Sequence, residues 1–185
     1  TVSEDVNATW GSVDLNATDV DVGDVLTWSV SSAASSGTAV ASGTGLFPSP
    51  FTYAPDSNFS GSDSFVVQVS DGALTDTITV PVMVNAVDDA PVITQGTSLP
   101  TKTGDEDTTF SWTVGELNAT DGDVGNTLTW SVNTNAPNGV ATVSGSGSNP
   151  TTFTYAPNAD FNGSDSFVVQ VSDGVLNDTI TVNVT

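Results

Sequence analysis

The residues of this chain that could do chemistry are almost all carboxylates. The chain carries 22 Asp and Glu residues against one cationic side chain, Lys102, and it has neither His nor Cys. Carboxylate oxygens are the ligands that hard cations such as Ca²⁺ prefer, whereas zinc and copper sites usually need His or Cys. With a formal net charge of −21, the chain repels itself unless cations lie among its acids. The composition therefore indicates cations bound by oxygen or, more simply, solubility in salty water.

The same composition excludes several functions. A chain with one basic residue cannot neutralise phosphates, so we exclude nucleic acid as a partner and disfavour anionic membrane surfaces. No apolar run approaches the roughly 20 residues that a membrane-spanning helix needs. Catalysis would depend on carboxylates, hydroxyls and Lys102, because His, Cys and Arg are absent. We therefore expect neither enzymatic activity nor membrane insertion.

The chain contains one module twice. The stretch Phe51–Val80 returns almost unchanged as Phe153–Val182, which is an offset of 102 from position 51 to position 153. Shorter motifs around this stretch keep the same offset without a gap. Self-similarity at a fixed period is the signature of tandem structural repeats. We therefore expect two domains, residues 1–87 and residues 88–185, each long enough to bury its own core.

Apolar and polar residues alternate along both modules. The run Phe65–Val69 has this pattern, and so do Leu26–Val30 and Ile78–Val84. A period of two predicts half-buried β-strands, and no window has a sustained helical period. Asp71-Gly72 between two such runs predicts a tight hairpin turn, whereas residues 31–50 form a variable polar stretch. We expect an all-β fold with two tandem Greek-key β-sandwich domains.

The four tryptophans allow two interpretations. Trp28 and Trp130 alternate in step with apolar neighbours, which places them in the core. We also expect Trp10 and Trp112 in the core, each near a short strand. The alternative is a carbohydrate-binding face, because exposed aromatic rings stack on sugars.

Two short acidic motifs resemble the start of a calcium-binding EF-hand loop. They are Asp19-Val-Asp21-Val-Gly23 and Asp121-Gly-Asp123-Val-Gly125. An EF-hand needs a bidentate Glu at its twelfth position, but Val30 and Val132 stand there, inside predicted strands. The motifs therefore do not predict EF-hands.

Several separated motifs resemble those of cadherin repeats and occur in the same order. Leu15–Val30, LNATDVDVGDVLTWSV, is similar to the cadherin stretch in which an Ala-Thr-Asp-Ala-Asp loop precedes a Leu-Thr-Tyr strand. Asn85–Pro91, NAVDDAP, resembles the cadherin linker Asp-x-Asn-Asp-Asn-x-Pro. Residues 53–72 and 155–174 share Tyr-x-Pro, then Phe-x-Gly-x-Asp-Ser-Phe and Ser-Asp-Gly, with the cadherin-like repeats of giant bacterial surface adhesins. The resemblance implies two cadherin/Ig-like β-sandwiches in an extended arrangement.

The resemblance also implies a role for particular acids, because cadherins bind Ca²⁺ between successive repeats. It implies a Ca²⁺ site at the joint with ligands from the first module, the linker and the second module: Glu4, Asp63, Asn85, Asp88, Asp89, Asp121, Asp123 and Asp173. It implies half-sites, completed by further modules, at Asp19, Asp21, Asp71, Glu106 and Asp165. We interpret four further loop acids as ordinary surface residues: Asp24, Asp56, Asp76 and Asp178.

The chain departs from the cadherin pattern at three places. Ser62-Asp63-Ser64 stands where the family has Asp-Arg-Glu, Asn85 replaces the first linker acid, and Val87 replaces an Asn. Since these departures leave fewer acids and fewer oxygen ligands than the family pattern has, we expect about one or two ions at the joint.

The hypothesis that follows is a set of calcium-stiffened structural or extender repeats of a large secreted or cell-surface bacterial adhesin. Its partners would be neighbouring repeats of the same or a like chain, with polysaccharide or another cell-surface ligand as a further partner. One alternative is a carbohydrate-binding or homophilic adhesion module. Another is a filament subunit that assembles by strand donation.

The beginnings of the two modules differ. The second module has the segment Val92–Thr103 before Glu106, whereas the first has only Thr1–Ser3 before Glu4. We expect that the chain is a window from a longer array, since tandem repeats usually come in numbers. The alternative is that another subunit supplies the first strand.

Overall fold

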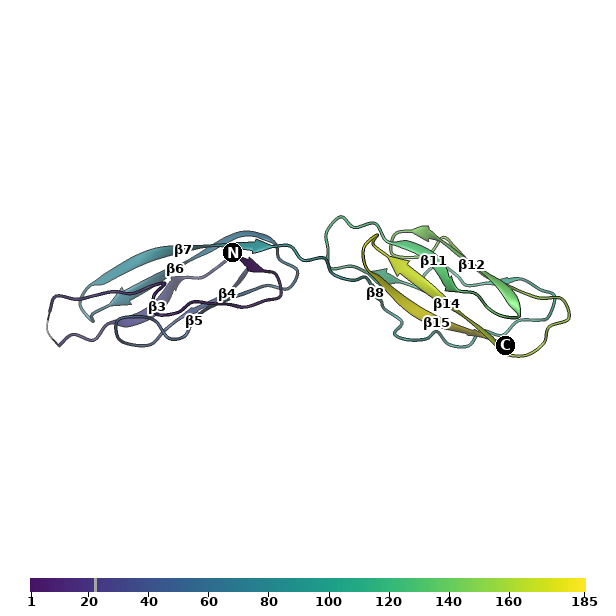
Figure 1. Ribbon diagram of the computed structural model, residues 1–185, viewed down its shortest axis with the longest axis horizontal. Coiled ribbons are helices and arrows are strands. Elements are labelled where there is room, and N and C mark those ends of the chain that lie inside the picture. Colours follow the sequence, from purple (N-terminus) through teal and green to yellow (C-terminus); the bar gives the residue numbers. More distant parts are fainter. Residues whose placement is uncertain (22) are drawn as a thin grey trace. The chain divides into compact units, whose positions relative to one another are not determined.

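The computed structural model of the chain describes residues 1–21 and 23–185. Its regular elements are strands, and the part of the chain that it describes contains no helix that could cross a membrane. The contacts divide the chain into two units, Thr1–Val87 (unit 1) and Asp88–Thr185 (unit 2). Figure 1 shows the strands of each unit.

Unit 1 contains two sheets. The first has the strand order β1 (Val2–Ser3), β7 (Thr75–Asn85), β6 (Gly61–Ser70) and β3 (Thr27–Ser32). The second has the order β2 (Ala8–Thr9), β5 (Phe51–Pro55) and β4 (Gly37–Ala41). β1 runs parallel to β7, whereas β6 is antiparallel to both β7 and β3. A bridge between Thr27 and Thr44 joins the two sheets at one corner.

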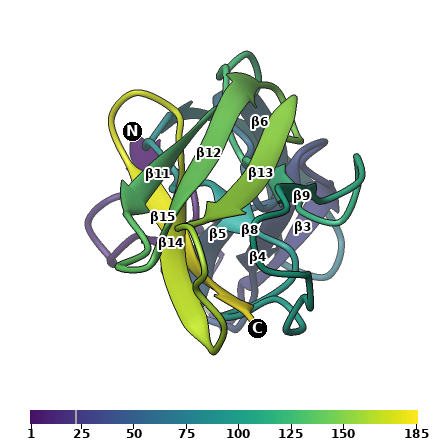
Figure 2. The same ribbon diagram turned by 90° about the vertical axis from the view of Figure 1, so that its right-hand side faces the viewer.

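Unit 2 repeats this plan. One continuous ladder has the order β15 (Asn177–Val184), β14 (Asp165–Ser172), β11 (Thr129–Thr134), β12 (Gly139–Ser146), β13 (Thr152–Pro157) and β9 (Phe110–Ser111). β11 and β12 share only the pairs Thr129–Ser146 and Trp130–Gly145, so the ladder changes sheet there. Figure 2 shows β12 beside β13. A second pair joins β8 (Val92–Ile93) to β10 (Ala119–Thr120).

The strands form because their residues alternate between core and surface. In β6, Asp63, Phe65 and Val67 are buried, whereas the residues between them are exposed or half-buried. The turn after β6 contains the predicted Asp71-Gly72, and Gly72 takes a φ of 101°, which glycine adopts without strain. The predicted all-β fold with two β-sandwich domains is confirmed.

Aromatic rings from both sheets fill each core. Tyr53 of β5 stacks on Phe65 of β6 at a centroid distance of 6.0 Å, and Tyr155 stacks on Phe167 at the same distance. Gly37 faces the Tyr53 ring so closely that a Cβ there would lie 2.6 Å from it. Glycine at this position therefore lets β4 lie across the tyrosine.

The structure adds strands that the sequence did not predict. β4 and β12 lie in the Gly-, Ser- and Asn-rich stretches that we expected to be variable and polar. Their hydrogen-bonding partners are β5 and β13, which follow them in the chain. Small residues have weak strand propensity, so this pairing, and not local preference, decides their conformation.

Candidate metal centre

Five acids of unit 2 come from three separate segments. Asp88 and Asp89 precede β8, Asp121 and Asp123 follow β10, and Asp173 lies in the turn between β14 and β15. The pairing of β8 with β10 brings the first segment to the second. The backbone N–H of Asp89 donates a hydrogen bond to Oδ2 of Asp123 at 2.7 Å.

Two oxygens of this group are buried and lack a hydrogen-bond donor. Oδ1 of Asp121 accepts the N–H of Asp123 at 2.8 Å. Oδ1 of Asp173 accepts the N–H groups of Val175 at 2.6 Å and Leu176 at 2.7 Å. Oδ2 of Asp121 and Oδ2 of Asp173, however, are buried with no partner among the described residues. Burying a polar atom without a partner is costly, so these oxygens are suited to an ion or water.

The electrostatics at Asp88 show that these acids repel one another. Desolvation, followed by the negative charges of Asp173, Asp123 and Asp121, raises the pKa of the Asp88 carboxyl, although a hydrogen bond with Asn126 opposes the shift. The Asp88 side chain is itself exposed. Desolvation and the surrounding negative charges thus both disfavour the ionised Asp88 carboxylate. A divalent cation would remove this repulsion.

The donor set fits a hard divalent cation. The residues that would hold it are Asp88, Asp121, Asp123 and Asp173, all of which offer carboxylate oxygens. Ca²⁺ takes roughly 6–8 oxygen ligands and accepts carboxylates in either one- or two-oxygen binding, so backbone carbonyls or water would complete such a site. The same set contains no nitrogen or sulfur ligand of the kind that zinc prefers.

The matching loop of unit 1 also gathers acids. Asp19, Asp21 and Asp24 each have an oxygen within 4.8 Å of the others, and all three side chains are exposed. The sequence suggests an ordinary surface role for Asp24, but the structure groups it with the two acids of the motif. The residue of unit 2 at the position of Asp24 is Asn126. Asn126 forms a hydrogen bond with Asp88, so this position of the repeat lies beside the acids in unit 2 as well.

Asp71 of unit 1 lies close to this group. Asp19 and Asp71 line one surface hollow of about 190 Å³. Oδ1 of Asp71 accepts the N–H groups of Leu74 and Ala73, both at 2.7 Å. These backbone hydrogen bonds, that from Leu74 first, hold the pKa of Asp71 below its usual value. Two of the predicted half-site acids thus share one location.

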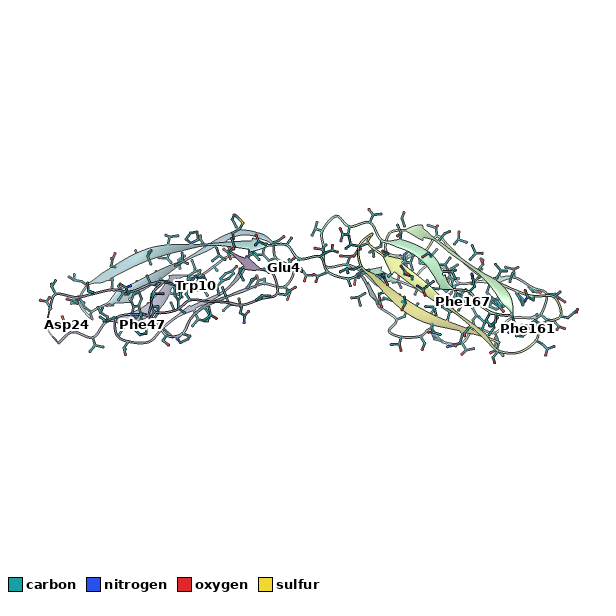
Figure 3. All side chains as sticks on the ribbon, in the orientation of Figure 1. Glu4, Trp10, Asp24, Phe47, Phe161 and Phe167 are labelled. Atoms are coloured by element: carbon teal, nitrogen blue, oxygen red, sulfur yellow. The ribbon has the colours of Figure 1, made fainter. Side chains whose placement is uncertain are left out.

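Glu4 and Asn85 lie at the other end of unit 1. Figure 3 shows Glu4 and Asp24 at opposite ends of this unit. Glu4 is only 3% exposed, its N–H donates to the carbonyl of Asn85 at 3.0 Å, and its Oε1 accepts the N–H of Val87. The Glu4 side chain therefore holds the last residues of unit 1.

Asp63 has a different environment from the acids of the loops. Its oxygens accept hydrogen bonds from five donors: Ser35 N, Ser35 Oγ, Ser36 N, Tyr53 Oη and Ser64 N. Burial alone would raise the pKa of Asp63, but these hydrogen bonds outweigh it and lower the pKa well below its usual value. Burial, with the bond to Asp63, raises the pKa of Tyr53 to about 12. Both carboxylate oxygens are thus occupied inside the fold, which leaves Asp63 no clear role as a metal ligand.

Asp165 is the counterpart in unit 2. It accepts the hydroxyl of Tyr155 at 2.7 Å and the N–H groups of Asn138 and Ser166. Burial and this bond raise the pKa of Tyr155. Glu106, in contrast, is exposed and lines a hollow of about 280 Å³ beside Tyr155.

The tryptophans belong to the cores. Trp28 and Trp130 are 6% and 3% exposed, and their indole N–H groups donate to the carbonyls of Gly45 and Gly147. Trp112 is also buried, whereas Trp10 is half-buried. Trp112 stacks on Phe153 at 4.1 Å and Trp10 on Phe51 at 4.7 Å. Burial and stacking remove the support for a carbohydrate-binding tryptophan face.

The paired sheets, their shared core plan and the loop acids define a tandem of Ig-like β-sandwich modules. The sequence profile of the family described as Bacterial Ig domain matches residues 1–83 and 88–185, so the chain belongs to this family. Domains of this family are typically extracellular and non-catalytic. No curated protein matches the chain.

Solved structures similar to this chain come from enzymes and from adhesion proteins. An endo-fucoidan hydrolase of glycoside hydrolase family 107, MfFcnA4, is 21% identical over 88% of this chain, with a TM-score of 0.40. Drosophila N-cadherin EC1-4 is 14% identical over 96% of this chain, with a TM-score of 0.46, and 45% of its own chain is covered. Human protocadherin-24 EC1-2 is 14% identical, with a TM-score of 0.42 and with 92% of this chain and 87% of that chain covered. The chain spans only 23% of the length of the hydrolase.

Proposed function

We propose that the chain is a pair of calcium-stiffened structural repeats of a large secreted or cell-surface bacterial adhesin. The repeats would extend and space a functional region that lies elsewhere in the protein. Neighbouring repeats of the same or a like chain would be their partners. Ca²⁺ would bind the acids of unit 2 that surround Asp88 and would act structurally, by holding the linker.

One observation carries this proposal. Asp121 and Asp173 each bury an oxygen that has no donor among residues 1–21 and 23–185, and Asp88 lies in the field of both. A cation would satisfy these oxygens and offset the charge at the same time. A solvated surface cluster would satisfy its oxygens with water and would need no such burial.

The hydrogen bonds of the linker residues support the proposed stiffening. The backbone N–H of Val87 donates a hydrogen bond to the Glu4 side chain in unit 1. The backbone N–H of Asp89 donates a hydrogen bond to the Asp123 side chain in unit 2. Only Asp88 stands between these two bonded residues in the chain. A cation bound to Asp88 would therefore restrain the remaining torsions of the linker.

Calcium titration of the whole chain tests the proposal. Because an ion that binds only the folded state stabilises it by mass action, millimolar Ca²⁺ should raise the melting temperature of unit 2. Calorimetric titration should detect binding, and Asp123→Ala should weaken the affinity by about tenfold or more, since it removes one charged ligand. Small-angle scattering should report a longer particle with Ca²⁺ than with chelator.

Matched variants and chelation decide the outcome. Asp56→Ala removes a surface acid outside the site and serves as the control for net charge. If Asp56→Ala weakens Ca²⁺ binding as much as Asp123→Ala does, the ion is held by general charge and not by this site. If chelator changes neither the melting temperature nor the scattering, the proposal is wrong.

A further inference from the structure

The chain contains seven Asn-x-Ser/Thr triplets, the sequence in which the side-chain amide of Asn can accept a glycan in a secreted protein. Two of them, Asn177 and Asn183, have Val175 and Thr181 two residues earlier. Acids are 22 of the 185 residues, so chance alone would place one before about one of the seven Asn residues. In five triplets, however, an acid stands two residues before the Asn: Asn7, Asn16, Asn58, Asn118 and Asn162.

The motif with its acid occupies different positions in the two copies of one loop. In unit 1 it is Asp56–Ser60, and in unit 2 it is Asp160–Ser164. With the offset of 102 from position 51 to position 153, Asn162 corresponds to Ser60 and not to Asn58. The motif has therefore moved by two positions, and the acid and the hydroxyl have moved with the Asn. Simple duplication does not explain this, because it would have kept the position.

The spacing of the motif has a chemical meaning in an extended chain. Side chains at positions i, i+2 and i+4 point to the same face of a strand, so the carboxylate, the amide and the hydroxyl lie side by side. A cationic group of an enzyme can pair with the carboxylate while hydrogen bonds hold the hydroxyl. The amide between them is then fixed in position for reaction.

The loops before β6 and β14 hold Asn58 and Asn162 at the surface. Both side chains are exposed, and neither side-chain amide has a hydrogen-bonding partner among residues 1–21 and 23–185. Their counterparts in the other unit, Asp160 and Ser60, are exposed as well, so this access belongs to the loop in both units. Figure 3 shows Phe161, which separates Asp160 from Asn162, at an end of unit 2.

Each loop contains a tight turn that can open without unfolding the core. In unit 1 the N–H of Phe59 donates to the carbonyl of Asp56 at 3.1 Å. In unit 2 the N–H of Phe161 donates to the carbonyl of Asn158 at the same distance. Exposed turns of this kind open locally at a low free energy. Opening would bring the motif into the extended form that presents its three groups together.

The other triplets supply internal comparisons. Asn118 has the acid but is half-buried, and its Nδ2 donates to the carbonyl of Gly115 at 2.6 Å. Its backbone N–H donates to Oε1 of Gln95 at 2.9 Å, so a second segment covers it. Asn177 is exposed but lacks the acid. The acid and the access thus occur together at Asn58 and Asn162.

We propose that Asn58 and Asn162 are acceptor sites for N-linked glycans. The donor is an oligosaccharide carried on a polyisoprenyl pyrophosphate, and the transferring enzyme binds the acid and the hydroxyl of the motif. The amide nitrogen attacks the anomeric carbon of the sugar, the bond from that carbon to the pyrophosphate oxygen breaks, and the nitrogen loses one proton to a base of the enzyme. The products are N-glycosyl asparagine and the polyisoprenyl pyrophosphate. Neither site includes an acid of the group around Asp88.

Transfer to the whole folded chain tests the proposal. The chain is incubated with a purified bacterial oligosaccharyltransferase and a polyisoprenyl-pyrophosphate heptasaccharide, and mass spectrometry of its peptides measures the glycan at each Asn. Glycan should appear at Asn58 and Asn162. Transfer to Asn177 should be at least about tenfold lower, because this site lacks the charged group that the enzyme binds. No glycan at Asn58 and Asn162, in a reaction that modifies a control acceptor peptide, would overturn the proposal.

Matched variants test whether the acid selects the site. Asp56→Ala keeps the Asn-x-Ser triplet, yet it should lower transfer at Asn58 by about tenfold and leave transfer at Asn162 unchanged. Asp56→Glu should restore the transfer, which separates a lost charge from a disturbed loop. Ser60→Ala should abolish transfer at Asn58. Equal transfer at Asn58 in Asp56→Ala and in the wild type would mean that any exposed triplet serves, and the proposed selection would be wrong.

Discussion

Ile78 of unit 1 and Ile180 of unit 2 occupy the same position of the repeat and have the same sequence neighbours, yet their environments are opposite. Ile78 and Ile180 both follow Asp-Thr and precede Thr-Val. Yet Ile78 is 49% exposed and Ile180 is 1% exposed. Residues 97–104 pair with β15, whereas among the described residues the matching edge of β7 is paired only by β1, at Val84 and Asn85. Burial is therefore a property of the completed sheet, and the strand alone does not set it.

The acid loops give a second contrast. Asp19 and Asp21 are exposed, whereas Asp121 and Asp123 are half-buried. In unit 2 the linker lies on the loop through the bond from Asp89 to Asp123. Covering the loop gives a cation less water to displace and more ligands, so we expect unit 2 to bind Ca²⁺ more tightly than unit 1.

The largest expected effect concerns the two isoleucines. Ile180→Ala should destabilise unit 2 by about 3 kcal/mol, because it removes a fully buried side chain and leaves a cavity. Ile78→Ala should cost unit 1 less than about 1 kcal/mol, since half of this side chain is already in water. Chemical unfolding, monitored by NMR resonances that are resolved for each unit, measures both losses of stability. Equal losses would mean that Ile78 is buried in solution.

The buried aspartates should instead behave alike in the two units. Asp63→Ala and Asp165→Ala each leave a tyrosine hydroxyl and backbone N–H groups unpaired, at a cost of about 2 kcal/mol. Because folding lowers the pKa of Asp63, its contribution is present above the ordinary Asp value and is lost as the pH falls below about 4. Melting of unit 1 between neutral pH and acid measures this loss. The acid profile should slope less in Asp63→Asn than in the wild type, and equal slopes would contradict the prediction.

Calcium affinity is the next comparison. Asp173→Asn should lower the Ca²⁺ affinity of the proposed unit 2 site by about tenfold, because it removes the charge of a buried oxygen that has no donor in the described part of the chain. Asp71→Asn, at the same position of unit 1, should leave the Ca²⁺ affinity of the unit 2 site unchanged. Titration calorimetry on both variants distinguishes them. An equal loss in both would contradict the assignment of the tighter site to unit 2.

The smallest effect concerns Asp88. Since folding raises the pKa of Asp88, the protonated form favours the folded state, and this stabilisation is lost as the pH rises through the folded pKa. In chelator, Asp88→Asn should therefore slightly raise the melting temperature of unit 2 at neutral pH. With Ca²⁺, the same change should lower it, because a ligand is lost. The same sign in both conditions would show that Asp88 does not contact the ion.

The sequence determined the duplication, the strands that have a period of two and the residues that these strands place in the core. The offset of 102, from position 51 to position 153, and the period of two in Phe65–Val69 are properties of the printed residues. Trp28 and Trp130 could be placed in the core because each belongs to an alternating strand. The acids of the Asp-x-Asp motifs could be grouped with the linker only through the resemblance to cadherin repeats, since no local pattern joins them.

Only the tertiary structure decided what each acid contacts. Asp63 and Asp123 are both loop-flanking acids in sequence, yet Asp63 is enclosed by five donors, whereas Asp123 receives the linker. Likewise, Asp24 lies outside the Asp-x-Asp motif, yet one of its carboxylate oxygens lies within 4.8 Å of carboxylate oxygens of Asp19 and Asp21. Periodicity reports which face of a strand a residue occupies. It does not report which distant segment covers that face, because that pairing depends on long-range hydrogen bonds that a local pattern does not contain.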